Sequence, residues 1–257
     1  MTTVAIIQVR MTSSRLPGKV LAMVAGQPLL YHVVRRARRA RTLDMVVVAT
    51  TDGPADDGVA RLCEDSSVPY FRGSEDDVLD RYYQAANAFK ADVIVRLTAD
   101  CPLLDPAVID KVVREFQSGS YDYVSNTIIP TYPDGLDTEV FLHSTLKRAW
   151  QEARLKSERE HVTPYIWKQP ALFRLLNVEN EPDLSALRWT VDEPQDLEFV
   201  RRVYSCMGSV PDFGMQEVLD LLHSHPELKD VNAGFERNEG YQESLREDSL
   251  TTRKESI

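Results

Sequence analysis

The sequence contains few cysteines and no long apolar run, and these absences exclude several classes of protein. Its three cysteines, Cys63, Cys101 and Cys206, are widely spaced and form no CxxC pair, so neither a zinc knuckle nor a redox pair is indicated. No stretch approaches the ~20 consecutive apolar residues of a membrane-spanning helix. The N-terminal residues lack the charged lead and apolar stretch of a signal peptide. We therefore expect a cytoplasmic protein with reduced thiols and no membrane partner.

Positive charge is also scarce. The formal net charge is -10, with 30 Lys and Arg residues against 40 Asp and Glu residues. Binding to nucleic acid regardless of its sequence needs a surplus of basic residues, so we expect no nucleic-acid partner. An anionic ligand must then be held by a local basic cluster or by a metal ion.

Short apolar runs alternate with segments of helical periodicity along most of the chain. Most of these runs are apolar on both faces, as in strands that are covered by helices on both sides of a sheet. The alternation predicts an α/β protein of Rossmann-like type with a mostly parallel central sheet. The expected strands are Val4–Val9, Met45–Thr50, Val93–Leu97, Tyr121–Ser125 and Leu187–Val191, and the expected helices are Pro28–Ala40, Asp56–Ser66, Val78–Phe89, Pro106–Gln117 and Pro194–Tyr204.

Three segments fall outside this alternation. Residues Asp137–Leu142 and Phe173–Asn177 have the pattern of further strands, which we expect to be antiparallel additions to the sheet. Residues 232–257 are polar, mixed in charge and nearly without apolar side chains, so they predict a disordered tail. We therefore expect one α/β domain over residues 1–231 and a disordered polar tail over residues 232–257.

The loop after the first expected strand is basic. Ligands of open α/β sheets bind at the carboxyl ends of the strands, so this loop is well placed to contact one. Small residues let backbone N–H groups approach phosphate oxygens, and cations neutralise them. The Walker pattern GxxxxGK[ST] is absent. The loop indicates a phosphate site of another kind, with a solvated basic loop as the alternative; its polar residues are Gln8, Arg10, Thr12, Ser13, Ser14, Arg15 and Lys19.

Two aspartates also follow apolar runs. Asp100 comes three residues after Val93–Leu97, and Asp192 directly follows Leu187–Val191. Both should reach the ligand edge of the sheet. Mg²⁺ needs such a pair, because it takes one or two protein carboxylates and completes its octahedron with water and substrate phosphates. Either aspartate could instead cap the helix that follows it.

These motifs resemble those of the CMP-sugar synthetases, the family of 3-deoxy-manno-octulosonate and acylneuraminate cytidylyltransferases. Gln8-Val-Arg10 with Ser13-Ser-Arg-Leu-Pro-Gly-Lys19 is similar to the family's first motif. Leu97-Thr-Ala-Asp100 resembles its Gln-Gly-Asp, and Val191-Asp192-Glu-Pro-Gln-Asp-Leu197 its Ile-Asp-Thr-Pro-Glu-Asp-Leu. Phrases that begin at Arg72, Asp134 and Arg159 look more narrowly like spore-coat polysaccharide biosynthesis protein F and its relatives.

The resemblance implies a function and a set of site residues. It implies transfer of CMP from CTP to a sugar or sugar acid, by attack of an acceptor hydroxyl on the α-phosphate with loss of pyrophosphate. It makes Arg15, Lys19 and Asp100 catalytic, and it makes Asp100 and Asp192 the ligands of Mg²⁺. The implied nucleotide-binding residues are Gln8, Arg10, Ser13, Ser14, Arg15 and Lys19, joined by Arg72, Gly73 and Ser74 near the base.

The acceptor side is less clearly marked. Asp137 and Glu139 alternate along an expected strand and share one face; they orient sugar hydroxyls if that face borders the cleft. His161 either binds an acceptor carboxylate or packs within its helix. The sequence leaves a homodimer open. It also leaves two rival functions, a glycosyltransferase that uses a nucleotide sugar and a non-catalytic nucleotide-binding protein.

Overall fold

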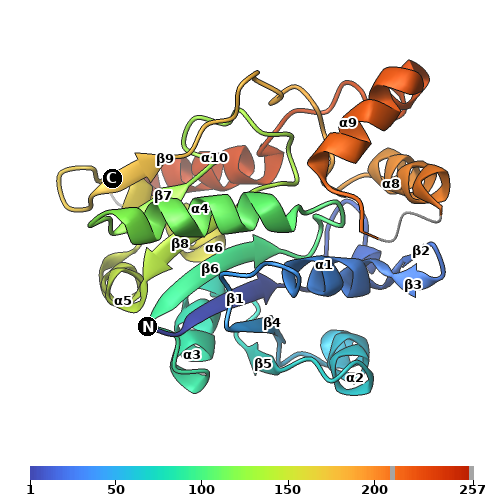
Figure 1. The fold of residues 1–257 in the computed structure, drawn as a ribbon. Helices are drawn as coiled ribbons and strands as arrows, with labels where there is room; N and C mark the ends of the chain where they lie inside the picture. The colour runs from blue at the N-terminus through green and yellow to red at the C-terminus, as the bar shows by residue number, and fades with distance from the viewer. Residues whose placement is uncertain (209–211, 255–257) are drawn as a thin grey trace.

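A computed structural model of the chain describes residues 1–208 and 212–254, the last four as backbone only. The central sheet has seven strands in the order β5-β4-β1-β6-β8-β7-β9 (Figure 1). Neighbours among β5, β4, β1 and β6 are parallel. The strands are β1 Thr3–Gln8, β4 Met45–Thr51, β5 Tyr70–Gly73, β6 Val93–Thr98, β7 Tyr123–Ser125, β8 Glu139–Leu142 and β9 Leu175–Asn177, and a separate antiparallel pair is formed by β2 Met23–Val24 and β3 Gln27–Pro28.

Helices cover both faces of this sheet (Figure 1). One buried apolar cluster joins the sheet to α1, α4 and α8, and a second joins it to α3 and α5. The helices are α1 Leu29–Ala37, α2 Asp57–Asp65, α3 Val78–Ala88, α4 Pro106–Ser118, α5 His143–Glu152, α6 Lys156–His161, α7 Pro164–Trp167, α8 Pro194–Met207, α9 Met215–Ser224 and α10 Glu239–Lys254, with short 3₁₀ turns at Lys19–Leu21, Pro54–Asp56 and Pro226–Asp230. Among the described residues, no helix is both long and apolar enough to cross a membrane.

The mostly parallel α/β sheet predicted from the sequence is confirmed. In register, Ile6 pairs with Val47 of β4 and with Arg96 of β6, so β1 is an interior strand of the sheet. The added strand β8 is antiparallel to both of its neighbours, as expected. The other added strand, β9, runs parallel to β7, so the prediction of an antiparallel strand is wrong there.

The expected strand Leu187–Val191 does not form. This segment is extended and buried at Trp189 and Val191, which explains its apolar pattern. It makes only an isolated bridge, between Asp134 and Arg188. The prediction failed because an apolar run indicates that a segment is buried, not that it pairs with another strand. This segment is buried, but no neighbouring strand in the described part of the chain forms a ladder of hydrogen bonds with it.

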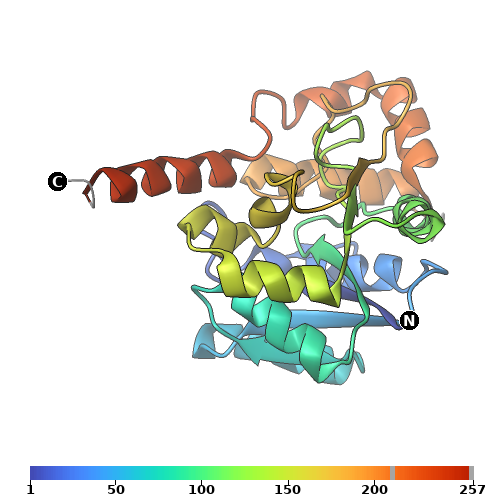
Figure 2. The same ribbon diagram turned by 90° about the vertical axis from the view of Figure 1, so that its left-hand side faces the viewer.

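The expected disorder of residues 232–257 is wrong over residues 239–254, which form α10; residues 255–257 lie outside the described part. Figure 2 shows α10 projecting from the side of the molecule opposite the N-terminus. The helix packs against α6, where polar contacts join Lys156 to Glu247, Ser157 to Asp248 and His161 to Ser244. A composition with few apolar residues predicts disorder because it cannot supply a core, and it gives no sign of such polar contacts.

Candidate active site

The basic loop after β1 is held in a closed shape by its own backbone and by Asp56. The Gly18 N–H donates to the carbonyl of Met11 at 2.9 Å, and Gly18 has φ 74, a left-handed conformation that favours glycine. The Met11 N–H donates to Oδ1 of buried Asp56 at 2.8 Å. The other oxygen of Asp56 accepts hydrogen bonds from Thr50 and Thr51 of β4. These bonds fix the loop to the carboxyl ends of two neighbouring strands.

The loop delivers Lys19 between the two predicted metal ligands. Its Nζ lies 3.1 Å from Oδ2 of Asp100 and 2.7 Å from Oδ1 of Asp192, and it donates to the carbonyl of Val191 at 2.7 Å. The Lys19 side chain is only 8% exposed. Burial by itself lowers the pKa of Lys19, but the charges of Asp100 and Asp192 outweigh it and raise the pKa above its usual range. The ammonium therefore stays charged within this cluster.

The Asp100 carboxyl is correspondingly held ionised. Burial would raise its pKa, but the Lys19 charge and a hydrogen bond from Thr98 lower it to about 2. Neither Asp100 nor Asp192 serves as a helix cap, which was the alternative to a role as metal ligand. Asp105 caps α4 by accepting from the Ala107 N–H at 2.7 Å, and at α8 the backbone amides of Asp192 and Glu193 both donate to Asp196. Both carboxylates are thus available to a ligand.

A tight backbone junction places Asp192 beside Asp100. The Val191 N–H donates to the carbonyl of Asp100 at 2.8 Å, and the Trp189 N–H donates to the carbonyl of Asp134 at 2.6 Å. At Gly135, a Cβ atom would come within 2.7 Å of the backbone at Trp189. The φ of Gly135 is 109, so glycine is required there both for conformation and for space.

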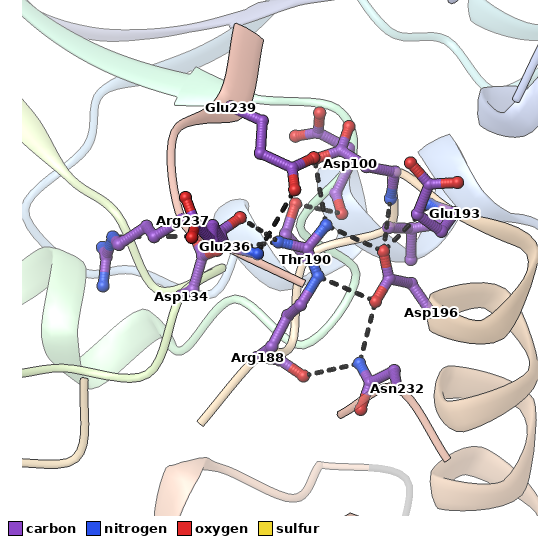
Figure 3. Close-up of polar contacts among 12 residues, drawn as sticks. Asp100, Asp134, Arg188, Thr190, Glu193, Asp196, Asn232, Glu236, Arg237 and Glu239 are labelled. Atoms are coloured by element: carbon purple, nitrogen blue, oxygen red, sulfur yellow. Dashed lines mark hydrogen bonds and ion pairs between the residues drawn. The ribbon is translucent and has the colours of Figure 1, made fainter. Parts of the chain in front are cut away.

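Arg188 stabilises the same junction through the contacts of its guanidinium group. Its guanidinium lies 2.9 Å from Asp196, whose side chain is fully buried, and 3.4 Å from both Asp134 and Asp192. Figure 3 shows Arg188 between Asp134 and Asp196, with Asp100 and Glu239 above them. Burial, followed by the neighbouring charge of Asp137, raises the pKa of Asp134 to about 7 despite Arg237 and Arg188.

Arg15, the other predicted phosphate-binding cation, stands at the opening of this cluster. Its guanidinium lies 3.0 Å from Asp192, 3.6 Å from Glu193 and 2.6 Å from Glu239. About a third of the side chain is exposed. Two cations and two aspartates predicted from separate motifs thus meet at the carboxyl ends of β1 and β6, where open α/β sheets bind ligands.

Comparison with known proteins identifies this architecture. The profile of a family described as cytidylyltransferase matches residues 4–221. The chain belongs to the cytidylyltransferase family. It is therefore a nucleotidyltransferase, as its motifs imply.

Three relatives illustrate the kinship of this cytidylyltransferase. Spore coat polysaccharide biosynthesis protein SpsF of Bacillus subtilis is 36% identical over 231 residues, which cover 86% of this chain and 94% of SpsF. The solved structure of a cytidylyltransferase from Leptospira borgpetersenii has a TM-score of 0.87 at 31% identity, covering 92% of this chain and all of that one. CMP:2-keto-3-deoxy-manno-octonic acid synthetase complexed with CTP has a TM-score of 0.64 at 20% identity, covering 80% and 99%; at that identity it shows the fold alone.

The remaining predicted nucleotide residues of this cytidylyltransferase are arranged in two groups. Gln8 ends β1, and its Oε1 is buried without a hydrogen-bond partner among the described residues. Arg10 turns away from Lys19 and lies 3.6 Å from Glu160 of α6. Ser13 and Ser14 lie in the basic loop, and Ser13 Oγ accepts from the Leu16 N–H at 3.4 Å.

The predicted base loop lies farther along the same edge, at the end of β5. Arg72 donates to the carbonyls of Thr51 and Gly53 at 2.9 and 2.8 Å, and it pairs with Asp57. Gly73 ends β5, and the next residue, Ser74, accepts from the Asp77 N–H. The contacts of Arg72 therefore shape the loop after β4.

Two of the three predicted acceptor residues, Asp137 and His161, contact the C-terminal segment (residues 235–250), whereas Glu139 is buried within the sheet. Asp137 forms an ion pair with Arg237. Glu139 is 5% exposed and is bound by Arg96 and by the Tyr123 hydroxyl. His161 lies 3.1 Å from the Ser244 hydroxyl, and burial, helped by the charges of Arg96 and Arg10, lowers its pKa to about 4.

Four charged residues of this site were not predicted from the sequence. Asp134 and Arg188 lie in phrases that were noted for other reasons, whereas Arg237 and Glu239 lie in the segment expected to be disordered. The sequence offers a signal for only two of the four. Asp134 lies shortly before the predicted acceptor residues, and Arg188 lies shortly before the predicted metal ligand Asp192. Nothing in the polar sequence around Arg237 indicates that it returns to the sheet edge.

A metal ion would fit at Asp100 and Asp192. One cation, the Lys19 ammonium, already contacts one oxygen of each carboxylate, so the two carboxylates converge on a single point. Within residues 1–208 and 212–254, no cluster of three or more His, Cys, Asp or Glu side chains is placed to hold a metal. Two carboxylates suffice for Mg²⁺ when phosphates and water complete its shell, but not for a structural zinc site.

Proposed function

We propose that this cytidylyltransferase transfers CMP from CTP to a hydroxyl group of a sugar or sugar acid and releases pyrophosphate. The observation that carries the proposal is the convergence of Lys19, Arg15, Asp100 and Asp192 at the carboxyl edge of the sheet. This arrangement offers cations to phosphates and carboxylates to a metal. Membership of the cytidylyltransferase family supports the choice of nucleotide, and the similarity to SpsF and to 3-deoxy-manno-octulosonate cytidylyltransferases supports the class of acceptor.

Arg15 and Lys19 would act on the leaving group. Negative charge builds on the β- and γ-phosphates as the bond to the α-phosphate breaks, and a fixed guanidinium and ammonium stabilise that charge without reorganising. The Arg15 fork can bind two phosphate oxygens at once, whereas Lys19 acts as a point charge. Both side chains must exchange carboxylate partners for phosphate oxygens when the nucleotide binds.

Asp100 and Asp192 would hold Mg²⁺. When bound, the ion would supply positive charge that stabilises the phosphates and lowers the pKa of the acceptor hydroxyl. No protein nucleophile is needed for a direct displacement. Catalysis would then rest on positioning and on charge stabilisation. Asp137 and Glu139, with His161 nearby, are the residues that we propose for the acceptor side.

The test is to incubate the protein with each nucleoside triphosphate, Mg²⁺ and a panel of sugars and sugar acids while measuring pyrophosphate. Acceptor-dependent pyrophosphate release from CTP is the expected result, and mass analysis of the product names the acceptor. Activity with a nucleotide sugar as donor, giving free nucleotide instead of pyrophosphate, would reveal a glycosyltransferase. A protein that binds nucleotide and releases nothing with any acceptor would be the non-catalytic alternative.

A further inference from the structure

The C-terminal segment, residues 235–250, returns to the carboxyl edge of the sheet. Asn232 fixes its approach by donating to the Arg188 carbonyl at 3.0 Å and to Asp196 at 2.9 Å. Arg188 in turn donates to the carbonyl of Glu236 at 3.2 Å. The profile of the cytidylyltransferase family ends at residue 221, so this segment lies beyond it.

Glu239, the first residue of α10, meets the nucleotide side of the site. Its carboxylate lies 2.6 Å from the Arg15 guanidinium, closer than Asp192 at 3.0 Å. Figure 3 shows Glu239 reaching from the C-terminal segment toward Asp100. A carboxylate and a phosphate present similar oxygens to a guanidinium, and both prefer its two-pronged geometry. Glu239 thus holds Arg15 by the same kind of contact that a triphosphate would make.

Arg237 meets the acceptor side. Its guanidinium forms an ion pair with Asp137, lies 3.8 Å from Asp134, and donates to the carbonyl of Tyr132 at 3.2 Å. Farther along the segment, Tyr241 packs edge-on against His161. One short stretch of chain therefore contacts a predicted phosphate-binding cation and two predicted acceptor residues.

The segment is attached by an ion pair and hydrogen bonds that a charged ligand can replace. Lys156 and Glu247 form an exposed ion pair, the Ser157 N–H donates to Asp248 at 3.2 Å, and the Ser244 hydroxyl lies 3.1 Å from His161. Exposed ion pairs contribute little to stability, and segments with few buried apolar contacts open locally at low free energy. A ligand with several negative charges can compete with such an attachment.

We propose that Glu239 is an internal competitor for the triphosphate site, and that nucleotide binding at Arg15 releases the C-terminal segment and uncovers the acceptor side. This inference rests on the proposed function for the position of the phosphates. It assigns the order of binding: the nucleotide enters first and the acceptor second. In the protein without nucleotide, carboxylates of the chain itself neutralise both phosphate-binding cations.

The test compares Glu239→Gln with Glu243→Gln, an equal change of charge at an exposed position one turn later on α10. Calorimetry measures the affinity of each variant for CTP and, separately, for inorganic pyrophosphate. Removing the competing charge should tighten binding of both ligands by roughly two- to five-fold, the range expected for a partly exposed ion pair. Glu243→Gln should bind them as the unmodified protein does. Equal affinity in all three proteins, equal tightening in both variants, or weaker binding by Glu239→Gln would overturn the proposal.

Amide hydrogen exchange of residues 239–250 supplies the second measurement. CTP should speed exchange in this segment of the unmodified protein, because the nucleotide releases it; slower exchange would mean that the segment closes over the nucleotide, and the proposal would be wrong. Pyrophosphate separates this inference from the choice of nucleotide. If pyrophosphate binds and CTP does not, the cytidylyl assignment fails, and the response of Glu239→Gln to pyrophosphate still decides the role of Glu239. If neither binds, there is no phosphate site at Arg15 and both proposals are rejected.

Discussion

The Nζ atom of Lys19 lies 2.7 Å from Oδ1 of Asp192, a residue 173 positions later in the chain. The same ammonium is 3.1 Å from Asp100. The positive charge of the buried ammonium offsets the negative charges of the two carboxylates. Loss of any one of the three groups would leave an ion without one of its partners in a poorly solvated site, which costs free energy. In the proposed complex, phosphate oxygens of the nucleotide would take the place of the carboxylates at the Lys19 ammonium, and Asp100 and Asp192 would then be free to hold a metal ion, so no charged group would be left without a partner.

Replacement of either carboxylate by its amide should remove activity and leave the fold intact, although each change also takes a charged partner from buried Lys19 and should lower the unfolding temperature. Asp100→Asn and Asp192→Asn each keep the side chain's shape and remove one charged ligand of the proposed metal. We expect kcat to fall by on the order of 10²–10³ or more, the loss seen when one charge-stabilising group is removed. Pyrophosphate release measures the rate, and circular dichroism with thermal unfolding measures the fold. Asp65→Asn, an exposed change at the end of α2, is the control. Near-normal turnover by Asp100→Asn under Mg²⁺ would remove Asp100 from the metal site.

CTP should protect the protein against thermal unfolding more than ATP, GTP or UTP does at equal concentration. A ligand that binds only the folded state stabilises it by about 2.7 kcal/mol at 100 times its dissociation constant. For a chain of this size, 1 kcal/mol moves the midpoint by roughly 2–4 °C. A larger shift with UTP or ATP would reject the cytidylyl assignment and keep the nucleotidyltransferase class. The same scan with pyrophosphate measures how much of the shift the phosphates supply.

The sequence predicts the parallel half of the sheet well because β1 and β6 lie between covered faces, and strands of that kind are continuous apolar runs. Their carboxyl ends must share one edge, so Lys19 and Asp100 could be expected together without knowledge of the contacts. Asp192 was expected at the same edge for a reason that proved wrong, since the residues before it form no strand. Its position comes instead from backbone contacts that require glycine at position 135.

The C-terminal segment shows the limit of composition as a guide. Its charged residues predict a solvated chain, yet Arg237 and Glu239 find partners of opposite charge at the sheet edge. Complementary charge between residues more than 200 positions apart, as between Arg15 and Glu239, leaves no periodic signal in a single sequence. It becomes visible only when the fold brings the two segments together.

We expect the neutral, partly buried side chain of His161 to make the free energy of unfolding fall as the pH is lowered. Its pKa is lowered from about 6.5 in an unfolded chain to about 4 in the folded protein, mainly by burial. Between these values the unfolded state binds more protons, so His161 contributes stability that is fully present above pH 6.5 and lost as the pH falls toward 4. Glu160 opposes this lowering, whereas the charges of Arg96 and Arg10 add to it.

His161→Gln isolates this contribution and retains a partner for Ser244. Asp134 works in the opposite direction over the same window, because its raised pKa favours the folded state as the pH falls. The free energy of unfolding in urea must therefore be compared between the two proteins at each pH. From pH 6.5 to 4, we expect the unmodified protein to lose up to about 3 kcal/mol relative to the variant. Parallel profiles would show that His161 titrates normally.

Lys19→Met tests the bridging cation itself, since it keeps much of the side chain's length and removes only the charge. An interaction that strengthens in the transition state is lost mainly from kcat, so we expect kcat to fall by on the order of 10²–10³ with a modest change in the KM for CTP. The change also removes the cation that lies between Asp100 and Asp192, although Asp192 keeps its ion pairs with Arg15 and Arg188. Removing one partner of a buried ion pair costs about 3–5 kcal/mol, so the metal-free variant should unfold at a lower temperature.

Mg²⁺ should then stabilise the variant more than the unmodified protein, because the ammonium no longer competes with it for the two carboxylates. Thermal unfolding with and without Mg²⁺ measures this difference in the absence of any substrate. Lys147→Met makes the same substitution at an exposed position of α5 and should change neither kcat nor the response to Mg²⁺. A large loss of kcat with no added response to Mg²⁺ would keep Lys19 as a phosphate-binding residue and place the metal away from Asp100 and Asp192. Normal turnover by Lys19→Met would instead show that the ammonium only balances the two aspartates, and the site of phosphate binding would have to lie elsewhere on the sheet edge.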